Sequence, residues 1–123
     1  MAFTVHSPRE RVRIYTDADV TAGTFTDSIT TSVAKAVFVS TNRSDTDLYI
    51  PLWRSDEERY ATQSDFVTTT GNNFCRKLTI SALGTNPTGT VMGVISGDLV
   101  PERLAVYNGH ASNDAIIQII VVF

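Results

Sequence analysis

Residues 115–123 read AIIQIIVVF, and this stretch decides the fold. Its side chains are mostly β-branched, which favours a strand over a helix. Successive side chains of a strand point to opposite faces, so this strand is apolar on both of them. Left uncovered, it would be an aggregation hazard. We therefore predict a central strand of a sheet, an oligomer interface, or both, and Gln118 needs a hydrogen-bond partner if it is buried.

The composition of the rest of the chain is also typical of a β protein. Ser and Thr make up 27 of the 123 residues, and no stretch is long and rich in Ala, Leu, Glu and Lys. A chain of this length can bury a core of its own, so we predict a single β domain over residues 1–123. About eight short strands separated by turns favour a β-sandwich or a jelly roll.

Alternation of apolar and polar residues marks the individual strands. We expect strands at Arg11–Tyr15, Ser32–Ser40, Leu48–Trp53, Phe66–Thr70, Phe74–Ala82, Thr90–Ser96, Leu104–Tyr107 and 115–123.

Turn and helix signals connect these strands. The polar cluster Thr41–Thr46 predicts a hairpin between the strands on either side of it. Pro51 cannot donate a backbone hydrogen bond, which predicts an edge position or a bulge there. The capping-box pattern Ser55–Glu58 predicts one short helical turn. We expect Asp17–Thr31, which is rich in Thr, Asp and Gly, to be a loop with at most one short strand.

The charge and the single cysteine exclude several classes of function. A net charge of −3 argues against a nucleic-acid partner, which would need clustered Lys and Arg. Cys75 is the only cysteine, so no internal disulfide and no multi-cysteine metal site is expected. No apolar stretch is long enough for a membrane-spanning helix, and residues 1–8 lack the pattern of a secretory signal. We therefore predict no membrane partner.

No combination of residues predicts catalysis, a metal centre or a cofactor. The two histidines, His6 and His110, are not at a metal-ligand spacing. Residues 110–114 place His, Ser and Asp in one segment, but no glycine-flanked serine elbow is present, so we interpret this segment as a solvated turn. The pairs Asp17/Asp19 and Asp45/Asp47 are either calcium ligands or turn residues, and neither has EF-hand spacing. We predict that the protein is not an enzyme.

Two groups of residues are candidates for contacts with a partner. An arginine cluster at alternate positions would share one strand face, where it either binds carboxylates of a neighbouring subunit or protects a solvated edge. Trp53, together with Tyr49 and Tyr60, either forms a sugar-stacking platform or fills a core or an interface. The candidate interface residues are Arg9, Arg11, Arg13, Trp53, Ile117, Ile119, Val121 and Phe123.

The texture of the whole chain resembles the small structural β-proteins of bacterial viruses, namely capsid cement or decoration proteins and jelly-roll vertex proteins. The resemblance is carried by the Ser/Thr-rich strands, by residues 36–42 (AVFVSTN) leading into residues 48–52 (LYIPL), and by the apolar run 115–123. It implies a non-enzymatic role on the capsid surface of a virion, after synthesis in the host cytoplasm. It also implies a homo-oligomer, commonly a trimer or pentamer, whose partner is the major capsid protein or another virion protein.

Two alternatives stay open beside this expectation. The first is a carbohydrate-binding β-sandwich module of a receptor-recognition apparatus, which would expose Trp53 and the Asp-bearing loops. The second is a small viral coat protein, which would need a basic sheet face for its genome, and the net charge argues against that.

Overall fold

The computed structural model describes residues 3–51, 77–80, 82 and 92–123. These residues form β-strands and one turn of 3-10 helix, which confirms the predicted all-β class. The elements are β1 (Thr4–Arg9), β2 (Val12–Val20), β3 (Ile29–Thr30), β4 (Ala36–Thr41), β5 (Leu48–Pro51), β6 (Lys77–Ile80), β7 (Met92–Ser96), η2 (Gly97–Leu99), β8 (Arg103–Leu104), β9 (Tyr107–Asn108) and β10 (Ala115–Val122).

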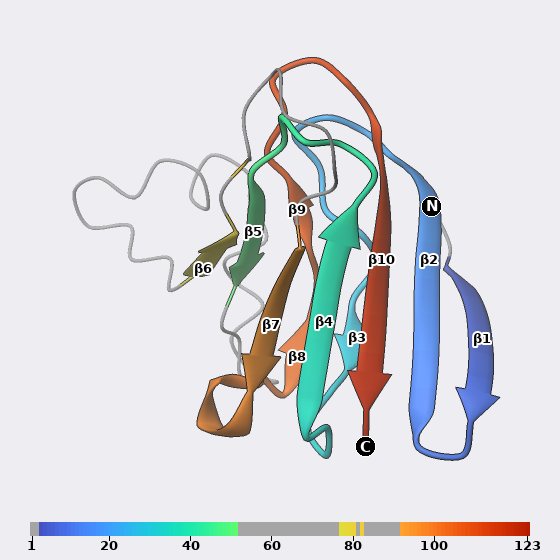
Figure 1. Cartoon of the computed structure of the whole chain (residues 1–123). Coiled ribbons are helices and arrows are strands. Elements are labelled where there is room, and N and C mark those ends of the chain that lie inside the picture. Colours follow the sequence, from blue (N-terminus) through green and yellow to red (C-terminus); the bar gives the residue numbers. More distant parts are fainter. Residues whose placement is uncertain (1–2, 52–76, 81, 83–91) are drawn as a thin grey trace.

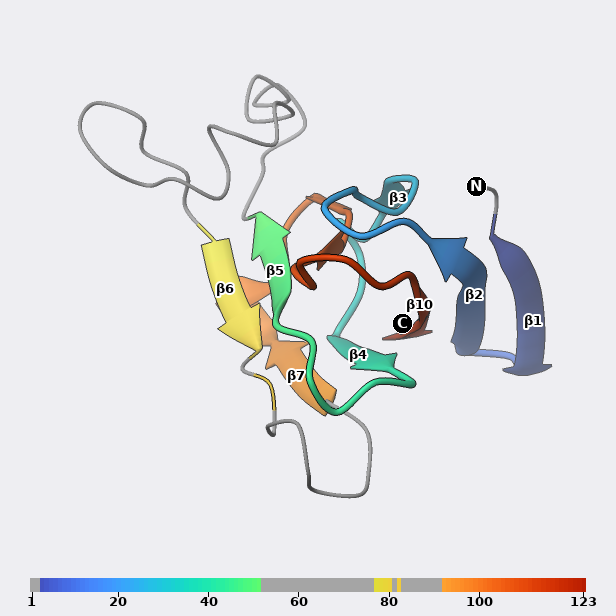
Figure 2. The same ribbon diagram turned by 90° about the horizontal axis from the view of Figure 1, so that it is seen from above.

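The strands form two layers. One layer is a five-stranded antiparallel sheet in the order β1-β2-β10-β4-β7, and the other contains a three-stranded sheet, β6-β5-β9, and the pair β3-β8. Figure 1 shows the five-stranded sheet in front of the smaller strands. Seen from above, β3, β5 and β6 all lie on the same side of the large sheet (Figure 2).

The second layer is continuous across the gap between its two parts. β8 and β9 are separated only by Ala105 and Val106, and Phe25 bridges Tyr107 in continuation of the β3–β8 ladder. The backbone N–H of Thr26 also donates to the carbonyl oxygen of Val106 at 2.9 Å. β8 and β9 are therefore one interrupted strand, which pairs with β3 on one side and with β5 on the other.

This connectivity is a jelly roll. With β8 and β9 counted together, eight strands follow β1. The first of these eight pairs with the last, the second with the second to last, and so on. β2 pairs with β10, β3 with β8, β4 with β7, and β5 with β6, all antiparallel. The chain is thus one long hairpin rolled up so that its strands alternate between two sheets, as in jelly rolls. The sequence-based fold prediction is confirmed.

The core lies between the two layers. Apolar side chains from the large sheet pack there against those from the small one, and the fully buried members are Val37, Val39, Leu48, Ile50, Leu104, Val106, Ile117, Ile119 and Val121. β10 is central, because it pairs with β2 on one side and with β4 on the other, as its sequence predicts. Gln118 finds the partner that it needs, since its Nε2 donates to Thr16 Oγ1 at 3.4 Å.

Gly93 allows the two layers to approach each other at β7. A Cβ atom on Gly93 would lie 2.6 Å from Cδ1 of Ile80, which belongs to β6 in the opposite layer. Real Cβ atoms do not come this close to another carbon, so a side chain at this position would displace the side chain of Ile80.

Three sequence-based predictions are corrected here. The predicted hairpin between β4 and β5 is wrong, because β4 pairs with β10 and β7 whereas β5 pairs with β6 and β9 in the other layer. The edge position predicted for Pro51 is wrong, because β5 is the central strand of its sheet. At Pro51 itself, however, β5 pairs only with β6. The segment 17–31 contains more strand than expected, because β2 continues to Val20.

Further differences concern single elements. β1 and the 3-10 turn at Gly97–Leu99 were not anticipated. The predicted helical turn at Ser55–Glu58 and the predicted strand Phe66–Thr70 lie outside the described residues, as does Cys75.

Candidate functional site

The side of the five-stranded sheet that faces away from the core is the candidate interaction surface, and we call it the outer face. The registers of the strands align its side chains in rows. The central row runs from His6 of β1 through Ile14 of β2, Ile120 of β10 and Phe38 of β4 to Val94 of β7. Phe38 is 37% exposed and Val94 is 60% exposed, while Ile14 and Ile120 are half-buried by their neighbours.

Two further rows flank the central one. On one side, Val12, Val122 and Ala36 extend the apolar surface. On the other side, Thr16, Gln118 and Ser40 form a polar but uncharged row that ends at Met92, which is 64% exposed. An apolar band therefore crosses four strands of the sheet without a covering layer of described residues.

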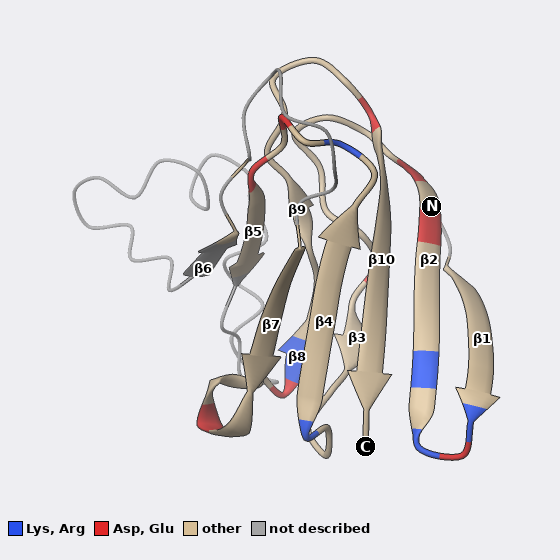
Figure 3. Cartoon of the chain, in the orientation of Figure 1, with Lys and Arg blue, Asp and Glu red and all other residues tan. Residues whose placement is uncertain are grey.

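The outer face carries almost no charge. The side chains that β10, β4 and β7 direct to it include no Asp, Glu, Lys or Arg, and β2 contributes one acidic residue at its end, the exposed Asp19 next to the inward-facing Val20. Figure 3 shows β4, β7 and β10 free of charged residues along their length. The other two charged residues of β2, Arg13 and Asp17, pair with Val121 and Ile117 and so point to the opposite side.

The candidate interface residues of β10 are not on this surface. Ile117, Ile119 and Val121 have 0% exposure and lie in the core of the chain itself. Because side chains alternate along a strand, the even-numbered residues Ile120 and Val122 face outwards instead. The interface prediction is thus corrected for the three odd-numbered residues, whose cover is the second layer of the same chain.

The arginine cluster does not share one strand face. β1 ends at Arg9, residues 10–11 form the turn, and β2 begins at Val12. Arg13 alone lies within β2, where its guanidinium carbon is 5.4 Å from the ring centroid of Phe123. Its Nη1 also donates to Tyr15 Oη at 3.2 Å. Arg13 and Phe123 therefore contact each other, on the side of the sheet opposite to the outer face.

Of the predicted aromatic platform, Tyr49 belongs to the described residues, and Trp53 and Tyr60 lie outside them. Tyr49 packs against Tyr107, with ring centroids 5.9 Å apart, and Phe25 contacts Tyr107 edge-on at 5.0 Å. Burial raises the pKa of both phenols. These rings thus form a small satellite cluster next to the main core.

His110 takes part in a polar cluster that fixes the loop before β10. Its Nε2 lies 3.1 Å from Asp45 Oδ2, and its Nδ1 accepts hydrogen bonds from the backbone N–H groups of Ser112 and Asn113. Since Nδ1 accepts, the neutral ring carries its proton on Nε2 and donates it to Asp45. Neither ring nitrogen is left to take a proton from Ser112, which argues against the Ser–His–Asp arrangement of a hydrolase.

Asp45 links this loop to Arg43. The guanidinium donates to both carboxylate oxygens, at 2.9 Å from Nε and 2.8 Å from Nη2. The hydrogen bonds from Arg43 and His110 lower the pKa of Asp45 to about 2. Asp45 is thus a structural anion that joins the loops before β5 and β10, and Asp47 instead accepts a hydrogen bond from the Ala82 N–H at 2.6 Å.

The other predicted carboxylate pair lies at the far end of β2. Asp17 is buried, and its Oδ1 accepts from the Asp19 N–H at 3.2 Å. A hydrogen bond with Asp114, together with the charges of Asp114 and Asp17, raises the pKa of Asp19. Among the described residues, no three His, Cys, Asp or Glu side chains converge in a way that could hold a metal ion.

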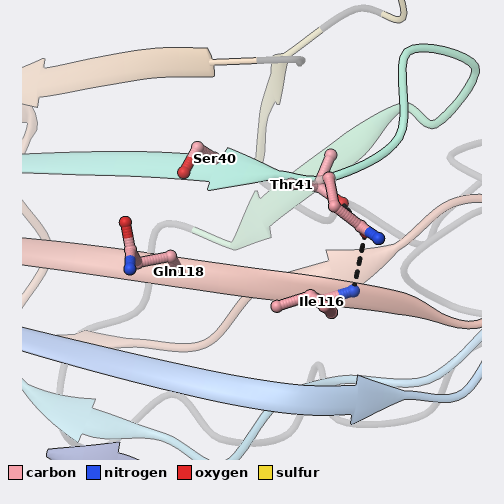
Figure 4. Close-up of a pocket in the computed structure, with 5 residues that line it drawn as sticks. Ser40, Thr41, Ile116 and Gln118 are labelled. Atoms are coloured by element: carbon pink, nitrogen blue, oxygen red, sulfur yellow. Dashed lines mark hydrogen bonds between the residues drawn. The ribbon is translucent and has the colours of Figure 1, made fainter. Parts of the chain in front are cut away.

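A shallow groove opens at the polar end of the outer face. Its volume is about 210 Å³, and it is lined by Ser40, Thr41, Asn42, Ile116 and Gln118. Figure 4 shows Ser40 of β4 beside Gln118 of the adjacent β10. Asn42 Oδ1 accepts from the Ile116 N–H at 2.9 Å, which fixes its side chain at the groove. The groove therefore offers uncharged hydroxyl and amide groups beside one aliphatic side chain.

No protein-family model matches the sequence, and no curated protein matches it either. The function is therefore inferred from the geometry described above. Within the described part of the chain, no helix has the length and apolar character needed to cross a membrane.

Proposed function

We propose that this chain is a non-enzymatic structural protein of a virion, which decorates or cements a phage capsid as a homo-oligomer. The outer face carries this proposal. Its apolar band crosses Ile14, Ile120, Phe38 and Val94, and the side chains in this row of the four strands include no Asp, Glu, Lys or Arg. Contiguous apolar surface of this kind marks sites of protein–protein contact, because single scattered apolar residues would not align across strands.

The fold and the polar clusters support the same proposal. Jelly rolls occur in viral capsid domains, although lectin domains and cupins also have them, so the fold alone does not decide the function. In the described residues, the one Ser–His–Asp segment uses both ring nitrogens of His110 to hold a loop. The partner that we propose is the major capsid protein or another virion protein.

The test of this proposal is the location of the chain in virus particles. Virions from the source of the sequence are banded on a density gradient, and an antibody against the chain is applied to the intact particles with gold labelling. We expect the chain to co-band with the capsid protein in a fixed ratio and the label to bind the outer surface. A chain missing from the particles, or accessible only after they are opened, would contradict the proposal.

A carbohydrate-binding module is the second candidate, favoured by the groove at Ser40, Asn42 and Gln118. Hydroxyl and amide groups both donate and accept hydrogen bonds, which matches a neutral polyhydroxylated ligand. A glycan array tests this candidate. Binding that is lost in Gln118→Ala and retained in Val33→Ala, an exposed residue away from the groove, would support it. An array without any bound glycan would contradict it.

A small coat protein that packages a genome is the least supported alternative. Its sheet face would need Lys or Arg for the phosphate backbone. β2, β10, β4 and β7 direct neither residue to the outer face.

A further inference from the structure

The inner face of the large sheet is already occupied, which leaves the outer face for a partner. Ile119 and Val121 are fully buried against the second layer of the same chain. On the other side of the same strand, Ile120 and Val122 remain partly exposed. An interface built on this sheet must therefore use the outward-pointing row.

The chemistry of the outer face selects its occupant. A strongly charged partner would find only Asp19, at the end of β2, among the side chains that β2, β10, β4 and β7 direct to this face. A second copy of the same face, in contrast, brings apolar side chains against apolar side chains and neutral polar groups against neutral polar groups. The face is thus complementary to itself, which is the requirement for a two-fold interface.

The edge of the sheet at β1 disfavours the alternative in which copies join edge to edge there. β1 contains Pro8 and ends at Arg9, and its register with β2 shifts between His6 and Arg9. Proline, charge and bulges are the features that protect a sheet edge against further pairing. Stacking of faces, in contrast to pairing at this edge, brings the whole width of the apolar band into contact.

We propose that two copies of this chain stack their outer faces about a two-fold axis, so that the central rows Ile14–Ile120–Phe38–Val94 meet. This inference rests on the proposed homo-oligomer and adds its surface and its symmetry: the unit is a dimer, where the family resemblance implies a trimer or pentamer. Packed sheets of this kind keep their strands within about 30° of each other.

The size of the face sets the strength of the contact. Four strands spaced about 4.8 Å apart, with about five residues each, give a projected face of about 330 Å² per copy. The smallest stable interfaces bury about 500–600 Å² per partner, and the accessible surface of a pleated face exceeds its projection. The dimer is therefore of modest affinity, and its population depends on protein concentration.

The test is the mass in solution, measured by sedimentation velocity over a concentration series. For the wild-type chain we expect a reversible shift from 13.5 kDa to twice that mass. Val94→Lys places a charge in the apolar contact and should raise the dimer dissociation constant at least about tenfold. Met92→Lys, at a second exposed position of β7, should act in the same direction.

Val5→Lys is the matched control. Val5 is 52% exposed and belongs to the same sheet, but it pairs with Tyr15 and so faces the opposite side. We expect its dissociation constant to stay at the wild-type value. Circular dichroism and the thermal midpoint of each variant at low concentration establish that the monomer is folded.

Three results would overturn the inference: a wild-type chain that stays monomeric up to its solubility limit, a trimer or pentamer as the smallest assembly, or equal weakening by Val5→Lys and Val94→Lys. Different results would contradict the proposed function. A monomer found on the capsid surface would remove the dimer and keep the location on the capsid, whereas a dimer missing from particles would remove the proposed function and keep the dimer.

Discussion

Ile119 and Ile120 are consecutive residues of β10 and lie on opposite faces of the large sheet. Ile119 is completely buried between the layers, whereas Ile120 lies on the outer face between Ile14 of β2 and Phe38 of β4. A strand that is uniformly apolar in sequence thus has one row of side chains in the core and one row available to a partner.

This difference predicts unequal effects of truncating the two side chains. Ile119→Ala removes fully buried methylenes and should lower the free energy of unfolding of the monomer by about 2–5 kcal/mol. Ile120→Ala should lower it less, because Ile120 is only half-buried in the monomer. Urea denaturation at low protein concentration measures both. Equal losses would show that the outer face is covered as well as the core.

Asn108 predicts a large polar contribution to stability. Its side chain is fully buried, and its Nδ2 donates to the carbonyl oxygens of Val20 and Asn113 at 2.9 and 3.1 Å. Its Oδ1 accepts from the His110 N–H at 3.0 Å. Asn108→Ala should cost about 1–3 kcal/mol for each group that it leaves buried without a partner.

The matched control for Asn108→Ala is Asn113→Ala. Asn113 is exposed and contributes its backbone carbonyl to this network, so its side chain should be dispensable. Denaturant unfolding compares the two variants. A loss of stability in Asn113→Ala as large as that in Asn108→Ala would contradict the role assigned to the buried amide.

Asp45 predicts a loss of stability in acid. Arg43 and His110 lower its pKa in the folded chain to about 2 from an ordinary value of 3.8. A folded-state pKa below the unfolded one means that the ionised form stabilises the fold. This contribution is complete above about pH 4 and disappears as the pH falls towards 2.

Asp45→Asn removes that dependence. The thermal midpoint of the variant should be lower than that of the wild type at pH 7, and the difference should shrink between about pH 4 and pH 2. Arg43→Gln should reproduce part of the loss, and the double variant should lose less than the sum of the two single variants. Strict additivity would show that the ion pair contributes nothing.

For Asp19 we predict a pH dependence of stability opposite to that of Asp45. Its hydrogen bond with Asp114 and the charges of Asp114 and Asp17 raise its pKa, so its ionised form destabilises the fold. Asp19→Asn should therefore raise the thermal midpoint at pH 7, and the gain should vanish in acid where the wild-type side chain is already protonated. Differential scanning calorimetry at the two pH values tests this. A gain that is the same at both would assign the effect to something other than charge.

The local sequence is sufficient to predict the central strand β10, but it is not sufficient to predict β1. The run at 115–123 predicts a central strand, because a strand this apolar would be an aggregation hazard at the edge of a sheet. β1 has no such signal, since its side chains are all exposed and Pro8 falls within it. The turn at residues 10–11 has no Gly, Asn or Pro, which explains why Arg9, Arg11 and Arg13 were expected on one strand.

The pairing of the strands and the outer face depend on contacts between distant parts of the sequence. The polar cluster after β4 predicts a turn, but nothing local tells a hairpin from a link that crosses to the other layer. Phe38 and Ile120 become neighbours only through the β4–β10 register. A period of two predicts which residues share a face within one strand and cannot predict which strands lie side by side.

The rolled-up hairpin also determines when the chain can fold. Its outermost pair joins Val12 to Val122, and β10 alone connects the β1–β2 pair to the β4–β7 pair. Non-local pairing of this kind folds slowly. On the ribosome, moreover, the sheet stays in two halves until β10 has been made, with Ile14 and Phe38 unpaired by their central strand. The five-stranded sheet can therefore form only after β10 has been synthesised and has joined its two halves.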